Sequence, residues 1–322
     1  MKRILVTYNM FREGFRELES KYDVTFPAGE NEYFSYNDVI RHIHEYDALC
    51  PMYDFPVNKE LLDKGTRLKL VANYAVGYDN IDVACALDKG VVVANTPDQV
   101  TEPTANLALA LLLSVARRVS EFDRKLHEQG KSVQIGVGYN LGLPVEGRML
   151  GIIGMGRIGK ALCRRARACG MTVCYHNRHR LPSDEEISLG ATYLSKDELL
   201  EKADFVSLNA PLTPETYHTI GEKELNKMKP AAILINTARG PLIDEKALIT
   251  ALENKQIHGA GLDMFEFGDY PSPELLTMDN VVLTPHFGTQ TTLARLGMAK
   301  AVCDNVIGFF ENDRPVKRVL RP

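Results

Sequence analysis

The sequence predicts an α/β protein made of two doubly wound parallel sheets covered by helices. Three observations support this fold class. Short β-rich runs alternate with helical stretches twice along the chain, a glycine-rich turn opens the second series, and 322 residues suit two domains better than one. Apolar residues at 45% and charged residues at 25% are the usual balance of a folded globular protein.

The composition argues against several classes of partner. A formal net charge of −4 gives no basic field for nucleic acid or for an anionic membrane, so a small-molecule partner is favoured. The longest apolar stretch, residues 107–116, is too short to span a bilayer, and the N-terminus lacks a signal-peptide pattern. The six cysteines show no metal-ligand spacing. We therefore expect a cytoplasmic protein with neither a membrane segment nor a metal site.

The first hundred residues carry the first α/β series. Apolar runs predict strands at 3–8, 22–26, 48–52, 68–72 and 91–95, and periodic apolar residues predict helices at 11–20, 37–46 and 58–64. Thr101 and Pro103 then begin one helical pattern that ends at Gly130. It predicts a single helix of about 25 residues, and its apolar residues on more than one face suggest a homodimer contact.

The second series begins at Arg148. Its apolar runs predict strands at 150–153, 172–175, 205–208, 232–236, 259–263 and 281–284. Strands in this number, with helical segments between them, suit one complete doubly wound sheet. A last helix is predicted at 291–310, where it can return the chain to the first domain.

A G-x-G-x-x-G pattern follows the first strand of the second series. Gly154 permits a tight turn, Gly156 lets the backbone approach a pyrophosphate, and Gly159 brings helix and strand close together. Arg157 and Ile158 begin the helix, whose N-terminus supplies N–H donors for an anion. In this strand–turn–helix context the pattern predicts a dinucleotide-binding site rather than a structural turn.

The residues after the next strand favour NADP over NAD. An acidic residue is expected roughly 20 positions beyond the glycines when the ribose is unmodified. Residues 157–183 contain no Asp or Glu, and Asn177 and Arg178 stand at this place instead. They can hydrogen-bond and pair with a 2′-phosphate. The alternative is a solvated basic loop without a ligand.

Seven segments carry a family pattern, in order, over essentially the whole chain. They are 73–82 (NYAVGYDNID), 93–97 (VANTP), the glycine pattern at 151–159, 210–216 (APLTPET), 236–240 (NTARG), 261–263 (GLD) and 280–286 (NVVLTPH). On these segments the chain resembles the D-2-hydroxyacid dehydrogenase family, which includes glyoxylate/hydroxypyruvate reductases and phosphoglycerate dehydrogenases.

The resemblance implies a domain order and a set of cofactor contacts. A Rossmann dinucleotide-binding domain, residues 99–288, would be inserted in a smaller flavodoxin-like substrate domain formed by residues 1–98 and 289–322. The implied substrate is a small 2-oxo or D-2-hydroxy acid. The further cofactor contacts that it implies are Thr104, Pro211, Thr216, Thr237, Ala238, Asp263 and Gly288. Two of these have simpler interpretations, since Asp263 could cap a turn and Thr104 could be an exposed helix residue.

Reduction of a 2-oxo acid needs a cation for the carboxylate, a hydride source and an acid for the developing alkoxide. Arg239 suits the first role because its planar edge can hold two oxygens. Of the eight histidines, only His286 follows a strand end beside a proline and near a glycine. We therefore expect His286 to be the general acid rather than a hydrogen-bonded core histidine.

The substrate contacts are expected from the first domain. The resemblance implies that the backbone amides of Val76 and Gly77 orient the carboxylate. Met52 and Tyr53 follow the third predicted strand, where selectivity for the substrate side chain should arise. Their apolar character favours a small or uncharged substituent over a phosphorylated one.

One position departs from the family pattern. Relatives usually carry a glutamate five residues after the aspartate of the Gly-Leu-Asp segment, where it orients the histidine and raises its pKa, but here that position is Gly268. Glu266 and Asp269 flank it, and we expect Asp269 to replace the missing acid as a catalytic group. The departure leaves two alternatives open. One is an NADP(H)-binding redox sensor or corepressor with weak or no turnover, and the other is an enzyme that oxidises a small anion such as formate or phosphite.

Overall fold

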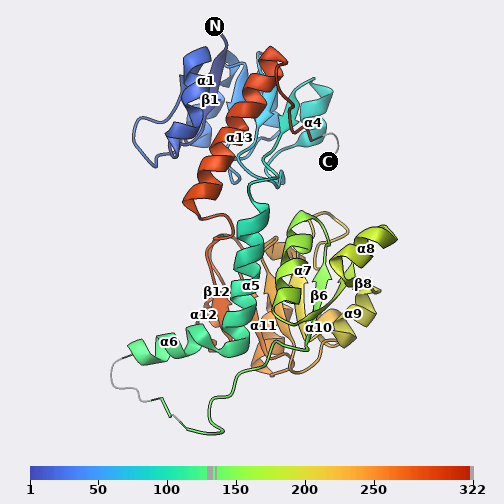
Figure 1. Cartoon of the computed structure of the whole chain (residues 1–322). Coiled ribbons are helices and arrows are strands. Elements are labelled where there is room, and N and C mark those ends of the chain that lie inside the picture. The colour runs from blue at the N-terminus through green and yellow to red at the C-terminus, as the bar shows by residue number, and fades with distance from the viewer. Residues whose placement is uncertain (129–132, 135, 320–322) are drawn as a thin grey trace. The chain divides into compact units, whose positions relative to one another are not determined.

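The computed structural model describes residues 1–128, 133–134 and 136–319. The chain forms two compact units, which we call unit 1 (residues 1–100 and 289 onward) and unit 2 (residues 101–288). Figure 1 shows the blue N-terminal and red C-terminal elements together in unit 1, so unit 2 is an insertion between its two parts. The predicted boundaries lie two residues away at the first junction and at the same place at the second.

Unit 1 is built on a parallel sheet with the strand order β2-β1-β3-β4-β5 in the described chain. Its strands are β1 (Arg3–Val6), β2 (Asp23–Thr25), β3 (Ala48–Cys50), β4 (Leu70–Ala72) and β5 (Val92–Ala94). Its helices are η1 (Arg12–Phe15), α1 (Arg16–Lys21), α2 (Tyr36–His42), η2 (Ile43–Glu45), α3 (Lys59–Lys64), α4 (Val83–Asp88) and α13 (Thr292–Glu311). This order is the flavodoxin-like one that the resemblance implied.

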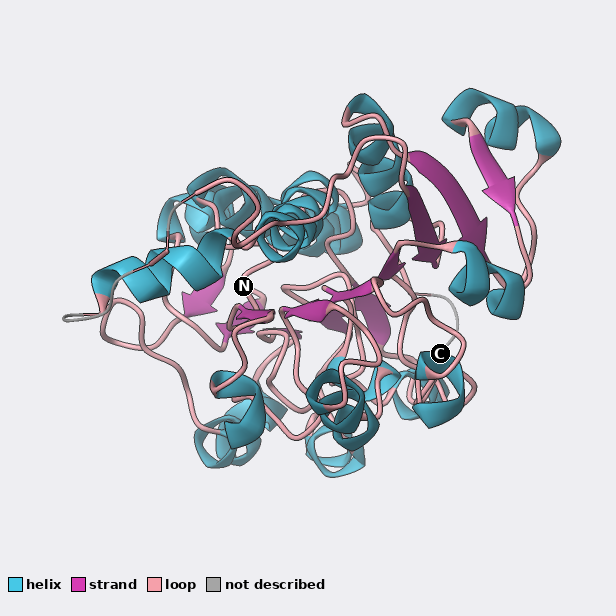
Figure 2. Cartoon of the chain, turned by 90° about the horizontal axis from the view of Figure 1, so that it is seen from below, coloured by secondary structure: helices cyan, strands magenta, loops and turns pink. Residues whose placement is uncertain are grey.

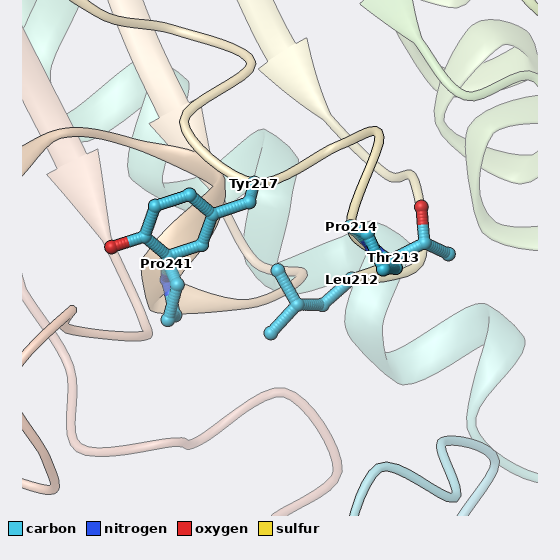
Figure 3. Close-up of a pocket in the computed structure, with 5 residues that line it drawn as sticks. All are labelled: Leu212, Thr213, Pro214, Tyr217 and Pro241. Carbon is cyan, nitrogen blue, oxygen red and sulfur yellow. The ribbon is translucent and has the colours of Figure 1, made fainter.

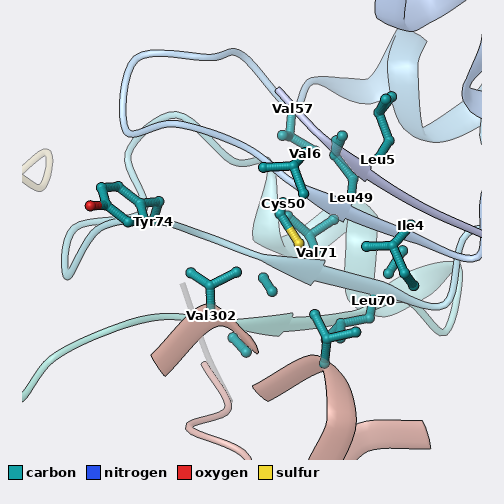
Figure 4. Packing of buried hydrophobic residues seen from close by; sticks show 14 of the residues in the cluster. Ile4, Leu5, Val6, Leu49, Cys50, Val57, Leu70, Val71, Tyr74 and Val302 are labelled. Carbon is teal, nitrogen blue, oxygen red and sulfur yellow. The ribbon is translucent and has the colours of Figure 1, made fainter. Parts of the chain in front are cut away.

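The core of unit 1 joins the sheet to the C-terminal helix. Ile4, Leu49 and Val71, from three neighbouring strands, are fully buried, and Val302 of α13 packs in the same cluster (Figure 4). Burying a side chain of this size contributes about 1.5–3 kcal/mol. The helix at the end of the chain therefore completes a core that begins at the first strand.

Unit 2 carries a larger parallel sheet with the order β12-β11-β10-β9-β6-β7-β8 in the described chain. Its strands are β6 (Met149–Ile153), β7 (Thr172–His176), β8 (Ala191–Tyr193), β9 (Phe205–Leu208), β10 (Ile233–Asn236), β11 (Gly259–Leu262) and β12 (Val281–Leu283). Its helices are α5 (Thr101–Arg117), α6 (Val119–His127), α7 (Arg157–Ala168), α8 (Ser183–Leu189), α9 (Lys196–Lys202), α10 (Glu222–Leu225), η3 (Gly240–Leu242), α11 (Glu245–Glu253) and α12 (Pro273–Leu276). Figure 2 shows helices on either side of the strands, which confirms the predicted α/β fold.

The strand order of unit 2 fixes where a ligand can bind. β6 pairs with β7 on one side and with β9 on the other, so the order reverses between β6 and β9. In doubly wound sheets, ligands bind outside the carboxyl ends of the strands at this reversal. The glycine-rich turn directly follows β6 and therefore lies at the expected place.

The structure corrects three expectations about the elements. The single long helix from Thr101 is wrong: it is two helices, α5 and α6, because Arg118 between them is left-handed with φ of 58°. The Arg118 guanidinium bonds to the buried carboxylate of Glu121 at 2.6 and 2.7 Å, which holds the break. β8 and α4 were not predicted, since segments of three and six residues give too little pattern.

Two further findings concern metal sites and membrane-spanning helices. Within the described ranges, no group of three or more His, Cys, Asp or Glu side chains is placed to hold a metal ion. Over the same ranges, every helix is too short or too polar to cross a membrane. The cysteines are free thiols, and burial raises the pKa of Cys174 and Cys303 to about 11.

Candidate active site

The glycine-rich turn is closely packed except where a phosphate would approach. Gly154 has φ of 98°, and a Cβ there would lie 2.6 Å from the backbone of Asn209 after β9. A Cβ on Gly159 would meet the carbonyl oxygen of Gly154. Around Gly156, the N-cap of α7, no described atom beyond the adjoining backbone lies within 4 Å of the corresponding position. The turn is thus open at the N-terminus of α7, where N–H groups favour an anion.

Asn177 supports this turn from the end of β7. Its Oδ1 accepts a hydrogen bond from the backbone N–H of Met155 at 2.7 Å. Two arginines follow in the basic loop. Arg180 is held by Glu186 through bonds of 2.9 and 2.7 Å, whereas Arg178 is exposed. Arg178 is therefore the arginine of this loop that can turn toward a ligand.

Two buried oxygens at the same edge of the sheet fit a bound ligand. Asn209 Oδ1 lies after β9 and Thr237 Oγ1 after β10, and neither forms a hydrogen bond with any described residue. A buried polar atom without a partner costs about 1–3 kcal/mol, so such atoms call for an explanation. Together with the glycine turn, they make this edge a suitable place for a dinucleotide.

The loop after β9 contains two of the expected cofactor contacts. The Thr216 hydroxyl donates to the carbonyl of Pro211 at 2.7 Å and accepts from the N–H of Thr213 at 2.7 Å. Pro211 and Thr216 therefore belong to one internally bonded loop, and their contacts with the cofactor stay a prediction. A pocket of about 520 Å³ lies beside this loop (Figure 3), lined by Leu212, Thr213, Pro214, Tyr217 and Pro241.

Arg239 follows β10 in a loop that Asn236 fixes. The buried Asn236 side chain accepts from the N–H of Ala238 at 3.0 Å and donates to the carbonyl of Arg239 at 2.8 Å. A Cβ on Gly240 would overlap the carbonyl of Phe265, so glycine is needed for the two loops to touch. The half-buried Arg239 thus stands beside the segment that follows β11.

His286 lies after β12 in a loop that Asp263 holds. The Asp263 carboxylate is 1% exposed and accepts bonds from the N–H of Phe287 at 2.6 Å, the N–H of Gly288 at 3.0 Å and the hydroxyl of Thr284 at 2.6 Å. Its backbone carbonyl accepts from the N–H of His286 at 2.9 Å. Burial raises the pKa of Asp263, although these bonds oppose the shift. His286 has φ of 52°, an uncommon backbone conformation that this support stabilises.

Thr104, on α5, contacts the loop that Asp263 and His286 share. Its hydroxyl is buried and donates to the carbonyl of Gly288 at 3.4 Å. A Cβ on Gly288 would lie 3.2 Å from Thr104 Oγ1 and 3.3 Å from Asp263 Oδ2. Thr104, Asp263 and Gly288, all expected to contact the cofactor, therefore form one cluster that positions the His286 loop. Their contacts with the cofactor itself stay predictions.

Glu266 is bonded to partners that sequence reasoning missed. Its carboxylate accepts from His218 Nε2 at 2.5 Å and from the N–H of Glu245 at 2.9 Å. Its own N–H donates to the Glu245 carboxylate at 2.9 Å, and the Tyr217 ring stacks on His218 with centroids 4.0 Å apart. Glu266 therefore anchors the turn after β11 to α11. No sequence signal indicated this, because His218 lies outside every catalytic motif.

Gly268 occupies the position of the family glutamate, in the same turn. It forms an antiparallel bridge with Phe265, and its φ of 129° is a conformation that L side chains rarely adopt. Asp269 follows directly and is exposed. The backbone here suits glycine, and the catalytic role of Asp269 stays a prediction.

In unit 1, asparagines fix the loop that carries Val76 and Gly77. Asn73 donates to the carbonyl of Gly77 and Asn95 to the carbonyl of Val76, both at 2.8 Å. In a trans peptide the N–H of Gly77 points opposite to the carbonyl of Val76. The N–H groups of both residues form no hydrogen bond within the described chain. They are thus available donors, as the resemblance implied for carboxylate binding.

Met52 and Tyr53, the expected selectivity residues, differ in exposure. Met52 is 4% exposed within the core of unit 1, and its N–H donates to the Thr7 hydroxyl at 3.1 Å. Tyr53 is half-buried and packs against that core. The Met52 side chain thus serves packing, and of the two side chains Tyr53 is the better placed to meet a ligand. Selectivity through either residue stays a prediction.

These features indicate a class of enzyme. A glycine-rich dinucleotide turn, together with an arginine after β10 and a histidine after β12 at the same edge of the sheet, meets the requirements of a dehydrogenase of small acids. Residues 109–288 match the model of the D-isomer specific 2-hydroxyacid dehydrogenase family, NAD binding domain. The chain belongs to this family, and it is an NAD(P)-dependent oxidoreductase that transfers a hydride to or from a 2-oxo or D-2-hydroxy acid.

Similar proteins extend the match to the whole chain. The glyoxylate reductase of Thermococcus litoralis is 44% identical over 97% of this chain and 95% of its own length. A glyoxylate reductase structure from Paecilomyes thermophila is 34% identical, with a TM-score of 0.87 over 99% of this chain and 98% of that one. The NADPH-dependent glyoxylate/hydroxypyruvate reductase of Sinorhizobium meliloti, solved with NADP and malonate, is 30% identical, with a TM-score of 0.85 over 99% and 97%.

Proposed function

We propose that the enzyme reduces a small 2-oxo acid of the glyoxylate or hydroxypyruvate type, with NADPH as the preferred hydride donor. The observation that carries this proposal is that β10, β11 and β12 lie side by side in the sheet. The chain segments that follow them carry Arg239, Asp263 and the His286 loop, respectively. The relatives named as glyoxylate reductases support the substrate class.

Each group has a distinct role in the proposed reaction. Arg239 holds the carboxylate and carbonyl oxygens of the substrate through its planar edge, and the N–H groups of Val76 and Gly77 add further donors. The bound nicotinamide supplies the hydride. His286 donates a proton to the alkoxide that forms on the former carbonyl oxygen. Asp263 keeps the imidazole in place by holding the loop on both sides of it.

The acid that supports His286 is proposed to be Asp269. Glu266 is bonded to His218 and Glu245, whereas Asp269 is exposed at the end of the same turn. Since this turn lies against the Arg239 loop through Gly240, a carboxylate at its end is close to the proposed catalytic groups in the fold. Asp269 would stabilise the protonated imidazole, as the family glutamate does.

The preference for NADPH rests on the end of β7. Asn177 offers its amide nitrogen while its oxygen holds the glycine turn, and Arg178 is exposed beside it. Neither side chain repels a 2′-phosphate as a carboxylate would. The relative solved with NADP is named as NADPH-dependent, which supports the same preference. The expected cofactor contacts at Gly154, Gly156, Arg157, Ile158, Thr237 and Ala238 belong to this proposal.

The oligomeric state and location are also proposed. Leu107, Leu109 and Leu113 of α5 are only partly buried, and Val119 and Leu126 of α6 are 59% and 71% exposed. Apolar side chains left uncovered on two adjacent helices suit a homodimer contact. We propose a homodimer in the cytoplasm, and sedimentation equilibrium of the purified protein tests the dimer.

The decisive experiment is a spectrophotometric screen. Nicotinamide absorbance is followed with NADPH and NADH against glyoxylate, hydroxypyruvate, pyruvate and longer 2-oxo acids. We expect the highest kcat/KM for glyoxylate or hydroxypyruvate with NADPH. Higher values for longer acids would refute the proposed substrate class. Equal values with both cofactors would refute the NADPH preference alone.

A further inference from the structure

His218 lies outside every catalytic motif, yet its main chain and its side chain contact two loops of the candidate site. It lies between β9 and α10, and its backbone N–H donates to the carbonyl of Pro241 at 2.9 Å, two residues after Arg239. Its Nε2 lies 2.5 Å from Glu266 Oε1, in the turn after β11. One residue therefore joins the segment that follows Arg239 to the turn that carries Asp269.

The turn after β11 is held at two points by one buried carboxylate. Glu245, which is 3% exposed, accepts from the N–H of Glu266 at 2.9 Å at one end of the turn. At the other end it accepts from the N–H and the hydroxyl of Ser272 at 3.2 and 2.5 Å. Asp269 lies midway between these two points in the sequence. The position of its carboxylate therefore depends on how firmly the Glu266 end is held.

The Glu266 end needs a donor besides the main chain, because two buried acids meet there. The Glu266 side chain is 7% exposed and accepts from the N–H of Glu245 at 2.9 Å, while the Tyr217 hydroxyl approaches it only to 3.4 Å. A buried carboxylate is costly unless it is hydrogen-bonded and paired. Among the described residues, His218 is the one basic side chain that bonds to either acid. Removing this donor should therefore weaken the hold on the turn.

The surroundings of His218 fix its conformation. The Tyr217 ring stacks on the imidazole with centroids 4.0 Å apart and 18° between the planes, and Asp244 Oδ2 lies 3.9 Å from Nδ1. The backbone φ of His218 is 48°, in the left-handed region that a residue with a side chain seldom adopts. Such a conformation persists only where neighbouring groups hold it, and it is frequent at functional sites. The side chain is thus preorganised as a donor to Glu266.

We propose that His218 is a positioning residue for the reaction: through Glu266 it holds the turn in the arrangement that lets Asp269 support His286. This role rests on the proposed function, because His218 acts through Asp269. Loss of the imidazole should lower kcat and leave KM for the substrate almost unchanged. The reason is that the segment after Arg239 is bonded to the main-chain N–H of His218, which a side-chain substitution keeps.

The test compares two substitutions of His218 in the full-length enzyme, with glyoxylate and NADPH as substrates. His218→Asn keeps a side chain that tolerates a left-handed backbone, but its amide stops short of the Nε2 position. It should lower kcat by about tenfold, since a displacement of about 1 Å can cost up to about 10²-fold, and change KM by less than about twofold. His218→Gln places an amide donor near the Nε2 position and should recover most of the rate. The His218 side chain is 29% exposed, so both variants should fold, which their Tm values check.

A double-mutant cycle with Asp269→Ala separates positioning from a merely structural role. If His218 acts through Asp269, adding His218→Asn to Asp269→Ala should lower kcat by less than about twofold more. Lys196→Met is the matched control, because Lys196 bonds to the carbonyl of Thr219, next to His218, and to Glu224, but not to the turn after β11. It loosens the same segment and should leave kcat unchanged.

Several results would overturn the role of His218. A parent-like kcat for His218→Asn, beside a reduced kcat for Asp269→Ala, would refute this role and leave the proposed function standing. Independent losses that multiply in the double variant, an equal loss in Lys196→Met, or no recovery in His218→Gln would show that His218 only stabilises the fold. A parent-like kcat for Asp269→Ala would instead refute the proposed support of His286, and with it the role of His218.

Discussion

At the scale of single residues, the proposed NADPH preference depends on Asn177, which supports the glycine turn, and on the charge of Arg178. We expect Asn177→Asp combined with Arg178→Ala to reverse the preference from NADPH to NADH. The aspartate still accepts from the N–H of Met155, as Asn177 does at 2.7 Å, but it repels a 2′-phosphate. Each lost charge-assisted contact is worth about 1.5–3 kcal/mol. The ratio of kcat/KM for the two cofactors measures the effect.

The matched control is another arginine of the same loop. Arg180 is held by Glu186, so Arg180→Ala should leave the cofactor ratio unchanged. If Arg180→Ala changes the ratio as much as the double variant does, the loop acts through its general charge. The specific role of Asn177 and Arg178 would then be wrong.

Arg239 is expected to act on the substrate and not on the cofactor. Arg239→Ala should lower kcat/KM by about 10²–10³-fold, because two charge-assisted bonds to the acid are lost. Arg239→Lys should recover little, since a single ammonium cannot reproduce the planar fork. The Kd for NADPH, measured by nicotinamide fluorescence, should stay within about twofold of the parent. A loss of cofactor affinity as large as the loss of kcat/KM would contradict this role.

Gly268 and Asp269 test how His286 is supported. We expect Asp269→Ala to lower kcat by up to about 10²–10⁴-fold and to move the fall in activity at high pH toward lower pH. The reason is that a neighbouring carboxylate stabilises the protonated imidazole. Gly268→Glu restores the family carboxylate, and Gly268→Ala measures the cost of a side chain at φ of 129° alone. An unchanged pH–rate profile for Asp269→Ala would exclude Asp269.

Residues of the candidate site could be predicted where a sequence motif puts a particular residue type directly after a predicted strand. Arg239 and His286 are predicted in this way, and the structure places both after strands at the carboxyl edge of one sheet, while their catalytic roles stay predictions. The link between His218 and Glu266 could not be found, because it depends on two loops meeting in space. The three hydrogen bonds from the His286 loop to the Asp263 carboxylate could not be predicted either, because they depend on how two segments far apart in the sequence meet.

At the scale of secondary structure, continuous apolar runs were predictable and short or interrupted elements were not. β6 and β9 are buried along most of their length, and their sequences are apolar except for Ser207. β8 has one buried residue in three and gives no such run. The break between α5 and α6 depends on one left-handed residue, Arg118, in an otherwise helical pattern.

Asp204 joins the starts of β6 and β9, and its charge should contribute to stability. Its carboxylate accepts from the N–H of Met149 at 2.9 Å and from Lys229 at 3.0 Å. Although burial alone raises the pKa of Asp204, these two partners hold it below its usual value. The folded protein therefore binds this proton less readily than the unfolded chain. The resulting stabilisation is present above the unfolded pKa of about 3.9 and is lost as pH falls through the lower folded value.

We expect Asp204→Asn to reduce the free energy of unfolding at pH 7 by about 1 kcal/mol. The difference from the parent should shrink as pH falls below about 4, because the parent carboxylate is then protonated as well. Urea denaturation at several pH values measures this difference in the free energy of unfolding. Asp197→Asn, which affects an exposed pair with Lys227, is the control and should change stability by less than about 0.5 kcal/mol. A difference for Asp204→Asn that is independent of pH would contradict the assignment.

At the scale of the whole molecule, the position of α13 predicts how the two units depend on the chain end. A chain that ends at residue 288 keeps every strand of unit 2 and lacks α13. We expect its unit 2 strands, such as β6 and β9, to stay protected in hydrogen exchange. Amides of β1, β3 and β4 should exchange much faster than in the full chain, because part of their core is missing. Equal protection of β1 in both chains would contradict this dependence.

The insertion of unit 2 also sets the order in which the protein can be completed on the ribosome. Residues 101–288 emerge as one continuous piece with all the strands of their sheet, whereas residues 1–100 must wait for α13. Until then, the apolar surface that Val302 and Ile307 later cover has no lasting partner. Unit 1, whose translation begins first, is therefore finished last, and its uncovered core is the part of the nascent chain that chaperones and proteases would meet.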